Sequence, residues 1–352
     1  MSDQVDANLR SQALLDLLHD RERVLIVMHD NPDPDALASA WALQTLLQAM
    51  LGRESRMVAG GAIVRAENRR MVDLLDVPVQ LVLNIEEGAE AAVILVDCGS
   101  TSNNQLLSRS GMQPLAIIDH HANSCGGQPP PFADLRPQVA ATATIAADYL
   151  RQQSVEPDAR LATALLYAVR TETRGSETSY SPIDSEMVVW LTERADAELL
   201  AEIENARLSK GWYSDLVLAM QCTALFDDAA LCFLPTAEGP EIVGEVADLL
   251  IRCEGVRRVL CAALIAGDLL ISVRTAKGAE DASDLVVAVI GKLGSGGGHR
   301  RRAGGKIPEV VNGAGGTPAV EQQIRTRWLD ACGVCDQPPQ QLVSWRDIVE
   351  HI

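Results

Sequence analysis

Three short stretches of the chain place acidic and imidazole side chains directly after apolar runs. They hold His29, Asp33 and Asp35 after the first run, Asp97 at the end of the second, and Asp119, His120 and His121 at the end of the third. Carboxylates gathered in one place repel one another and raise one another's pKa, and a bound cation removes this conflict. Mixed histidine and carboxylate ligands suit Mn²⁺, Fe²⁺, Zn²⁺ or Mg²⁺. The set therefore predicts a metal centre.

The number of possible ligands suits two ions rather than one. Two divalent ions about 3.5–4 Å apart form the clamp that enzymes use for in-line displacement at phosphorus. Each residue alone has a plainer explanation, because an aspartate after a strand is usually a helix cap or a turn residue. The prediction of metal-assisted hydrolysis thus depends on the three stretches meeting in space.

The first half of the chain alternates two patterns that would bring these stretches together. Continuous apolar runs, typical of strands buried on both faces, cover residues 24–29, 55–61, 91–100 and 114–121. Helical apolar spacing covers residues 35–50, 65–76, 141–153 and 159–173. This alternation predicts an α/β fold, a parallel sheet with helices on both faces. Ligands bind at the carboxyl ends of such strands, where all three stretches would lie.

A change of pattern predicts a second, smaller α/β domain across a cleft. Strands are expected at 257–267 and 268–276, then a helix at 282–293, a glycine-rich loop at 294–307 and a last helix near 319–332. We predict four segments in all. They are a metal-binding catalytic domain at 1–195, a helical linker at 196–225, a substrate-binding domain at 226–325 and a C-terminal tail at 326–352.

Composition narrows the class of protein. The 352 residues carry a formal net charge of −18, which disfavours long duplex nucleic acid as a partner because counterion release needs a basic face. The sequence contains no run of 18 apolar residues, so we expect no membrane span. Residues 1–15 lack a signal-peptide core. We expect a soluble cytoplasmic protein. Its 8 cysteines are read as small buried hydrophobes in a reducing compartment, and the single "CGVC" at 332–335 is a weak metal or redox signal.

The glycine-rich segment "GSGGGHRRRAGG" predicts an anion site. Glycines let backbone N–H groups approach an anion closely, and His299 with the arginines at 300–302 adds positive charge. Residues 285–308 contain no acidic side chain, although the chain as a whole is strongly acidic. The plainer alternative is a flexible glycine-rich turn with solvated arginines.

The motifs "HDNPDPDALAS", "VDCGS" and "IDHHANS", in this order, resemble the sequential motifs of the DHH phosphoesterase superfamily. "FADLRPQVAATATIAADYL" and "LLYAVRTETRG" fit the next segments of that family, and "ISVRT" followed by the glycine-rich segment resembles the DHH-associated C-terminal domain. The resemblance spans about residues 22–310. In length and two-domain layout the chain is most similar to the short-oligoribonuclease (nanoRNase) and pAp-phosphatase branch.

The resemblance implies ligands for two Mn²⁺ ions that share one carboxylate. They are His29, Asp33 and Asp97 for one ion, and Asp35, Asp97 and His120 for the other. His121 would face the scissile phosphate, so Asp97 and His121 would be the catalytic residues. Asn31 and Asp119 would support these groups from behind the ligands.

Two further sets of residues complete the implied site. The family normally has an aspartate, a further ligand of the second ion, where this sequence has Glu172. Glutamate still offers a carboxylate, but it is one methylene longer. A terminal phosphate or far nucleotide would be held by residues of the second domain, namely Arg274, Gly297, Gly298, His299 and Arg300.

The implied function is hydrolysis of short oligoribonucleotides, above all linear dinucleotides of the pApA or pGpG type, to mononucleotides. Removal of the 3′-phosphate from pAp and cleavage of cyclic dinucleotides stay open, as does a non-catalytic nucleotide-binding protein if Glu172 breaks the metal site. Processive exonuclease action fits less well, because a long single-strand channel would want stacking aromatics and aromatic residues make up only 3% of the chain. The expected partner is a short oligoribonucleotide, and a homodimer is considered.

Overall fold

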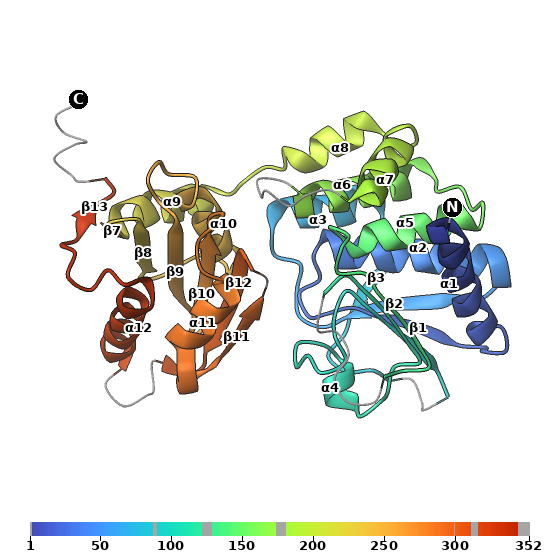
Figure 1. Ribbon diagram of the computed structural model, residues 1–352, viewed down its shortest axis with the longest axis horizontal. Coiled ribbons are helices and arrows are strands. Elements are labelled where there is room, and N and C mark those ends of the chain that lie inside the picture. The colour runs from blue at the N-terminus through green and yellow to red at the C-terminus, as the bar shows by residue number, and fades with distance from the viewer. Residues whose placement is uncertain are drawn as a thin grey trace. The chain divides into compact units, whose positions relative to one another are not determined.

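The structure is a computed structural model that describes residues 2–86, 90–121, 129–173, 181–298, 300–310 and 316–343. It divides into two compact units, residues 1–207 and 208–352 (Figure 1). The predicted linker at 196–225 holds two helices, α8 (Ala197–Glu204) in the first unit and α9 (Lys210–Cys222) in the second.

The first unit is built on a six-stranded sheet in which every strand pair is parallel. Its strands in spatial order are β3 (Val79–Leu81), β2 (Ser55–Ala59), β1 (Val24–Val27), β4 (Ala92–Val96), β5 (Ala116–Asp119) and β6 (Phe132–Leu135). The four predicted strands are its four central members. The short outer strands β3 and β6 were not predicted, because polar residues or prolines interrupt the apolar residues around them, "VPVQLVL" at β3 and "FADL" at β6.

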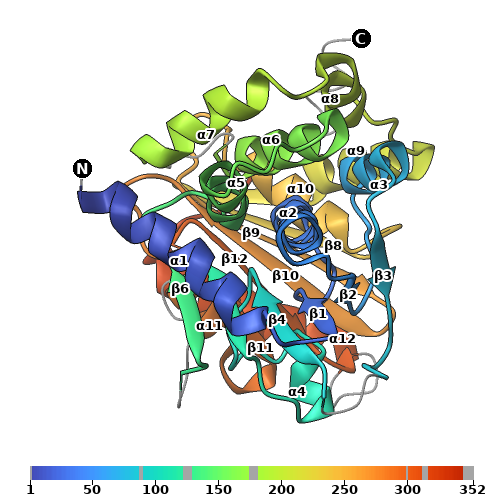
Figure 2. The same ribbon diagram turned by 90° about the vertical axis from the view of Figure 1, so that its right-hand side faces the viewer.

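Helices precede, connect and follow these strands. They are α1 (Ser2–Leu18), α2 (Pro34–Leu51), α3 (Ala66–Leu75), α4 (Leu107–Ser110), α5 (Thr142–Gln152), α6 (Ala159–Thr173), α7 (Pro182–Thr192) and α8. Local signals fix the ends of α2: the side chain of Asp33 accepts from the Ala36 amide, and Gly52 ends the helix at a φ of 60°. The long α1 packs against α5 and β6 (Figure 2).

The two faces of this sheet are buried in different ways. Ile26 of β1 and Ile94 of β4 belong to a large core that includes residues of α1, α2, α5 and α6. Their neighbours Leu25 and Leu95 point to the opposite face, into a smaller core with Leu107 of the short α4. Most helices thus lie on one side of the sheet and α4 on the other (Figure 1). The predicted parallel sheet with helices on both faces is confirmed.

The second unit is a mixed α/β domain with a seven-stranded sheet. In spatial order its strands are β11 (Ser295–Gly298), β12 (Arg302–Ile307), β10 (Asp268–Thr275), β9 (Arg258–Ile265), β8 (Ala229–Leu234), β7 (Thr223–Phe226) and β13 (Gln340–Gln341). Its helices are α9, α10 (Glu241–Leu250), α11 (Ala282–Ile290), the 3₁₀ turn Gly291–Leu293 and α12 (Gly316–Cys332). One core holds residues of α9 and α10, and a separate core holds residues of α11 and α12.

The predicted glycine-rich loop at 294–307 is instead a β-hairpin formed by β11 and β12. The reason is the close packing of α11. A Cβ atom placed on Gly296 or Gly305 would lie 2.9 Å or 2.2 Å from Ile290 Cδ1. Glycine lets the Ile290 side chain pack directly on the strand backbone. The glycine-rich composition, which is typical of loops, therefore occurs here in two paired strands.

Among the described residues, no helix is both long enough and apolar enough to cross a membrane.

Candidate metal centre

The carboxyl ends of three adjacent strands carry the predicted ligands. Strands β1, β4 and β5 are neighbours and run parallel. His29 lies two residues after β1, Asp97 directly follows β4 at a φ of 57°, and Asp119 is the last residue of β5. His120 continues the chain from Asp119 into the same edge. The parallel topology therefore brings the three sequence stretches together.

Two groups of three side chains meet at this edge. The first group is His29, Asp33 and Asp97, and the second is Asp97, His120 and His121. Within each group one ligand atom of every residue lies within 4.8 Å of the others. Asp97 belongs to both groups, as expected for a ligand that two ions share.

The two oxygens of Asp97 face different partners. Its Oδ2 lies 3.7 Å from His29 Nε2, and the same nitrogen is 3.8 Å from Asp33 Oδ1. Its Oδ1 lies 3.7 Å from His120 Nε2, which is also 3.7 Å from Asp35 Oδ2. This single carboxylate therefore presents one oxygen to each side of the cluster.

The imidazoles of His29 and His120 are held in the orientation that suits metal ligands. His29 Nδ1 lies 2.9 Å from the Asp30 carbonyl oxygen, and His120 Nδ1 lies 3.4 Å from the Val139 carbonyl oxygen. Because a carbonyl only accepts, each Nδ1 carries a proton, and each Nε2 faces the carboxylates as the atom that would bind a metal in place of a proton. A backbone partner of this kind is usual behind a metal-ligating histidine.

The spacing of these atoms fits a cation. Separations of 3.7–3.8 Å are too long for hydrogen bonds. Two ligand atoms, each about 2.1 Å from one ion in tetrahedral geometry, would be separated by about 3.4 Å, close to these values. The residues present therefore fit divalent ions held between nitrogen and oxygen ligands.

The electrostatics of the cluster show the conflict that a cation would remove. Burial, followed by the charges of Asp35 and Asp33, raises the pKa of Asp97 well above its usual value. Burial and then the charge of Asp33 raise the pKa of Asp35 to about 7. Burial opposes a charge on His29, but the nearby Asp33 carboxylate and the Asp30 carbonyl outweigh it and raise the His29 pKa to about 9. His29 in turn holds the pKa of Asp33 below its usual value, against the effect of burial.

Asp35 also has a structural partner. Its two oxygens accept the Thr142 and Ala143 amides at 2.8 Å and 2.6 Å. These amides belong to the first turn of α5, where N–H groups have no partner within the helix. Asp35 therefore caps α5 while one of its oxygens faces His120. It is in neither three-residue group of the described chain, and its role as a ligand stays a prediction.

His121 differs from the other two histidines. Asp119 accepts both the His121 amide and its Nδ1, at 3.0 Å and 2.5 Å, through Oδ1. Asp119 is fully buried, whereas about a third of the His121 side chain is exposed. This pairing fixes the ring and leaves Nε2 as its second polar atom, and the role of His121 toward substrate stays a prediction.

Two further predicted residues lie at the margin. Asn31, at a φ of 56°, accepts the Ala62 amide with its side chain and donates its own amide to Gly60, so it ties the loop after β1 to the end of β2. Glu172 is half-buried in the last turn of α6. Neither belongs to the two groups found among the described residues, and the role of Glu172 as a ligand stays a prediction.

The predicted anion-binding residues of the second unit have a different setting. Arg274 Nε donates to Asp248 of α10 at 2.5 Å, and its Nη1 donates to Ser272 Oγ at 2.7 Å. Gly297 and Gly298 are exposed on β11, the edge strand of the sheet.

Of the two remaining predicted anion-site residues, the structure describes only Arg300. The Arg300 side chain is exposed, while its carbonyl accepts the Ala282 amide at the start of α11. His299 lies outside the described residues.

Sequence reasoning missed two of these partners. Thr142, which donates to both Asp35 and Asp97, stands at the first position of α5, where a helix-start pattern could have drawn attention to it. Asp248 was missed because α10 itself was not predicted.

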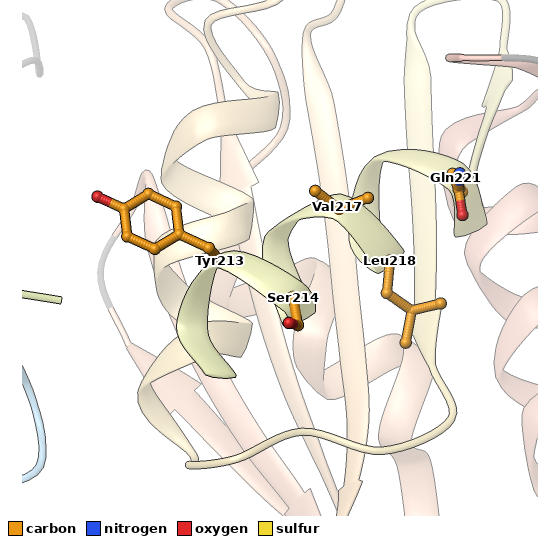
Figure 3. Close-up of a pocket in the computed structure, with 5 residues that line it drawn as sticks. All are labelled: Tyr213, Ser214, Val217, Leu218 and Gln221. Carbon is orange, nitrogen blue, oxygen red and sulfur yellow. The ribbon is translucent and has the colours of Figure 1, made fainter. Parts of the chain in front are cut away.

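A shallow depression elsewhere on the surface contains none of the predicted site residues. It is lined by residues of α9: Tyr213, Ser214, Val217, Leu218 and Gln221 (Figure 3). The chemistry of the molecule is therefore assigned to the strand ends of the first unit and not to this depression.

Comparison with known proteins identifies related chains. Residues 23–169 match the family described as DHH family, N-terminal domain. An uncharacterized protein of Methanocaldococcus jannaschii is 31% identical over 320 residues, which is 89% of this chain and 65% of that protein. The aligned chain thus spans less than two thirds of the length of that relative.

Solved structures share the fold across both units. An exopolyphosphatase-related protein from Bacteroides fragilis has a TM-score of 0.68 at 14% identity, covering 92% of this chain and 96% of the other. RecJ from Thermus thermophilus, in complex with Mn²⁺, has a TM-score of 0.53 at 17% identity, covering 92% of this chain and 55% of the other.

Proposed function

We propose that this chain, whose residues 23–169 match the DHH family, N-terminal domain, is a metal-dependent phosphodiesterase. It would hydrolyse short oligoribonucleotides, above all linear dinucleotides, to mononucleotides. The observation that carries the proposal is the placement of Asp97, which presents one oxygen to His29 and the other to His120. A carboxylate shared in this way is suited to two ions that act together on one phosphate.

The proposed cofactor is a pair of divalent ions, with Mn²⁺ as the metal to test first. His29, Asp33 and Asp97 would hold one ion. Asp35, Asp97 and His120 would hold the other, with Glu172 as a further ligand. When bound, such ions polarise a phosphoryl oxygen and lower the pKa of a bound water to near neutrality.

The residues of the chain itself perform the remaining tasks. Asp119 holds the proton on His121 Nδ1, so that His121 Nε2 is fixed in one direction. We propose that this nitrogen, when it carries a proton, donates a hydrogen bond to an oxygen of the scissile phosphate. A histidine fixed by a buried carboxylate loses little freedom when substrate binds, which favours reaction over mere binding.

The second unit supplies the proposed binding site for the distal phosphate or nucleotide. Residues 285–308 lack acidic side chains, and the exposed glycines of β11 have an open strand edge with backbone N–H groups. Arg274, already paired with Asp248, would add a fixed positive charge, and Arg300 and His299 are the other side chains proposed for this site. Recognition of one distal phosphate favours short substrates over long strands.

A substrate panel tests the proposal. The full chain, loaded with Mn²⁺, is incubated with pApA, pGpG, pAp, cyclic di-AMP, pyrophosphate and polyphosphate, and products are resolved by length. Mononucleotides from pApA or pGpG are expected. Release of phosphate from pAp alone would establish a 3′-phosphatase instead, and nucleotide binding without any turnover in saturating Mn²⁺ would establish a binding protein.

A further inference from the structure

We propose that Thr142 and Asp184 are positioning residues for the metal centre: Thr142 orients the shared carboxylate Asp97, and Asp184 fixes the segment 139–144 that carries Thr142. The inference rests on the proposed function, because it assigns these residues a task toward metal ions. Neither side chain would touch substrate or metal.

Thr142 donates hydrogen bonds to two predicted ligands. Its amide donates to Asp35 Oδ2 at 2.8 Å, and its hydroxyl donates to Asp97 Oδ1 at 2.8 Å. Thr142 and Asp35 are essentially fully buried, so water cannot replace these bonds. A carboxylate oxygen has two lone pairs, and the hydroxyl occupies one of those on Oδ1. The carboxylate plane of Asp97 is thereby fixed while a lone pair remains for the side of His120.

The residues next to Thr142 serve the same cluster. The Val139 carbonyl faces His120 Nδ1 at 3.4 Å, and the Ala143 amide donates to Asp35 Oδ1 at 2.6 Å. The segment 139–144 therefore contacts three predicted ligands, two of them through backbone atoms. Its position decides where those ligands point, and a shift of the segment would move all three together.

Asp184 of α7 holds this segment from the side. It is fully buried. Its oxygens accept the Ala140 amide at 3.1 Å and the Thr144 hydroxyl at 2.6 Å, on either side of Thr142. The remaining bonds come from the Ser181 amide and hydroxyl, which form the cap of α7.

This arrangement exceeds what a helix cap requires. A capping box needs only the reciprocal bonds between Ser181 and Asp184. The same carboxylate goes on to satisfy Ala140 and Thr144, which are 44 and 40 residues away in the chain. Outer partners that orient metal ligands typically change metal affinity by 10–100-fold when they are removed.

The first experiment compares Thr142→Val, Thr142→Ser and Thr163→Val in the full chain. Valine keeps the shape of threonine without the hydroxyl, and serine restores the hydroxyl. Thr163 is a matched control, because it is also fully buried but its hydroxyl bonds the Ala159 carbonyl and the Asp196 amide, outside the cluster. Mn²⁺ binding is measured from the electron paramagnetic resonance signal of the free ion, and folding is measured by the thermal midpoint.

Thr142→Val is expected to weaken Mn²⁺ binding by about tenfold and to lower kcat with KM unchanged. Thr142→Ser should return both values to near those of the wild type, and Thr163→Val should leave them unchanged. A folded Thr142→Val variant that binds Mn²⁺ as tightly as the wild type would overturn the role of Thr142.

The second experiment compares Asp184→Asn with Met187→Ala. Met187 is a fully buried residue of the same helix that belongs to the apolar core, so its truncation destabilises α7 without removing a bond to the segment. Asp184→Asn is expected to lower both the thermal midpoint and the Mn²⁺ affinity, whereas Met187→Ala should lower only the midpoint. Equal Mn²⁺ affinities in these two variants would show that Asp184 only caps helix α7 and does not position the metal ligands.

The metal readout separates this inference from the proposed function. A wild-type chain that binds Mn²⁺ but hydrolyses nothing would refute the proposed activity, and the affinity ratios of the variants would still decide the inference. A wild-type chain that binds no Mn²⁺ would overturn both.

Discussion

The two proposed binding regions treat charge in opposite ways. At the strand ends of the first unit, burial and then the charges of neighbouring carboxylates raise the pKa of both Asp35 and Asp97. In the second unit, Arg274 and Lys306 are paired with Asp248 and Asp268. The first region is incomplete without a cation. In the second, Arg274 and Lys306 already have carboxylate partners, so an anion would be bound there mainly by the exposed Arg300 and by exposed backbone groups of the glycine hairpin.

The difference teaches how a strongly acidic chain can act on phosphate esters. The attraction for a substrate anion need not come from free lysines or arginines on the surface. Bound metal ions can reverse the local field at the acidic cluster, while backbone N–H groups contribute partial positive charge without adding a side chain. Four predictions test this contrast, ordered from the largest expected effect.

Removing the shared carboxylate should have the largest effect. Asp97→Asn is expected to lower kcat by about 10³-fold, because metal stabilisation of the transition state is worth several kcal/mol and about 1.4 kcal/mol corresponds to tenfold in rate. Steady-state hydrolysis of pApA in Mn²⁺ measures this. Asp227→Asn is the control, because Asp227 follows β7 in the second unit at a φ of 55° that asparagine tolerates. Near-normal turnover in Asp97→Asn would remove the two-metal model.

The metal-free chain should lose stability as pH rises. The pKa of Asp35 is raised to about 7 and that of His29 to about 9, so the folded state binds more protons than the unfolded state between about pH 4 and 9. Each group can then lower the free energy of unfolding by up to about 1.4 kcal/mol per pH unit. The lowered pKa of Asp33 acts in the opposite sense only below about pH 4.

Urea unfolding at pH 5, 6, 7 and 8, with and without Mn²⁺, measures this dependence. Stability should fall with pH in the presence of a chelator, and Mn²⁺ should stabilise the chain most at pH 8. A metal-free chain whose stability rises over this range would show that the pKa values of Asp35 and His29 are not raised in the folded state.

The glycine hairpin should tolerate a side chain at one position and not at another. Gly305→Ala places a Cβ 2.2 Å from Ile290 Cδ1 and 2.8 Å from the Ser295 carbonyl oxygen, so a loss of about 1–3 kcal/mol in stability is expected. Gly297→Ala meets no atom within 4 Å and should leave the fold intact. Chemical denaturation of both variants measures the difference, and equal stabilities would contradict the close packing of α11 on the hairpin.

The ion pair of Arg274 should moderate substrate affinity. Arg274→Ala is expected to raise KM about tenfold with little change in kcat, because it would remove a distal contact made equally before and during reaction. Asp248→Asn removes the carboxylate that neutralises Arg274 and should lower KM severalfold. Initial rates over a range of pApA concentrations test both. A loss confined to kcat in Arg274→Ala would rule out a purely binding role.

Much of the first unit could be predicted because its pattern is local. The apolar runs before His29, Asp97 and Asp119 are long enough to mark buried strands, and parallel strands must end at one edge. Outer strands β3 and β6 and helix α10 were not predicted, because their apolar residues are few or spread over one helix face. The glycine hairpin was taken for a loop, because the contact with Ile290 that favours glycine there comes from a different element.

The sequence by itself determined the chemistry of the first unit: alternating strands and helices, acidic and imidazole groups after three strands, and hence a cluster that a cation would stabilise. The tertiary structure alone decided how that chemistry is held. The bonds of Thr142 to Asp35 and Asp97, those of Asp184 to the segment 139–144, and the neutralisation of Arg274 by Asp248 join residues far apart in the chain. Periodicity reports only which face of an element is apolar, so long-range polar pairs of this kind emerge only when the elements have packed.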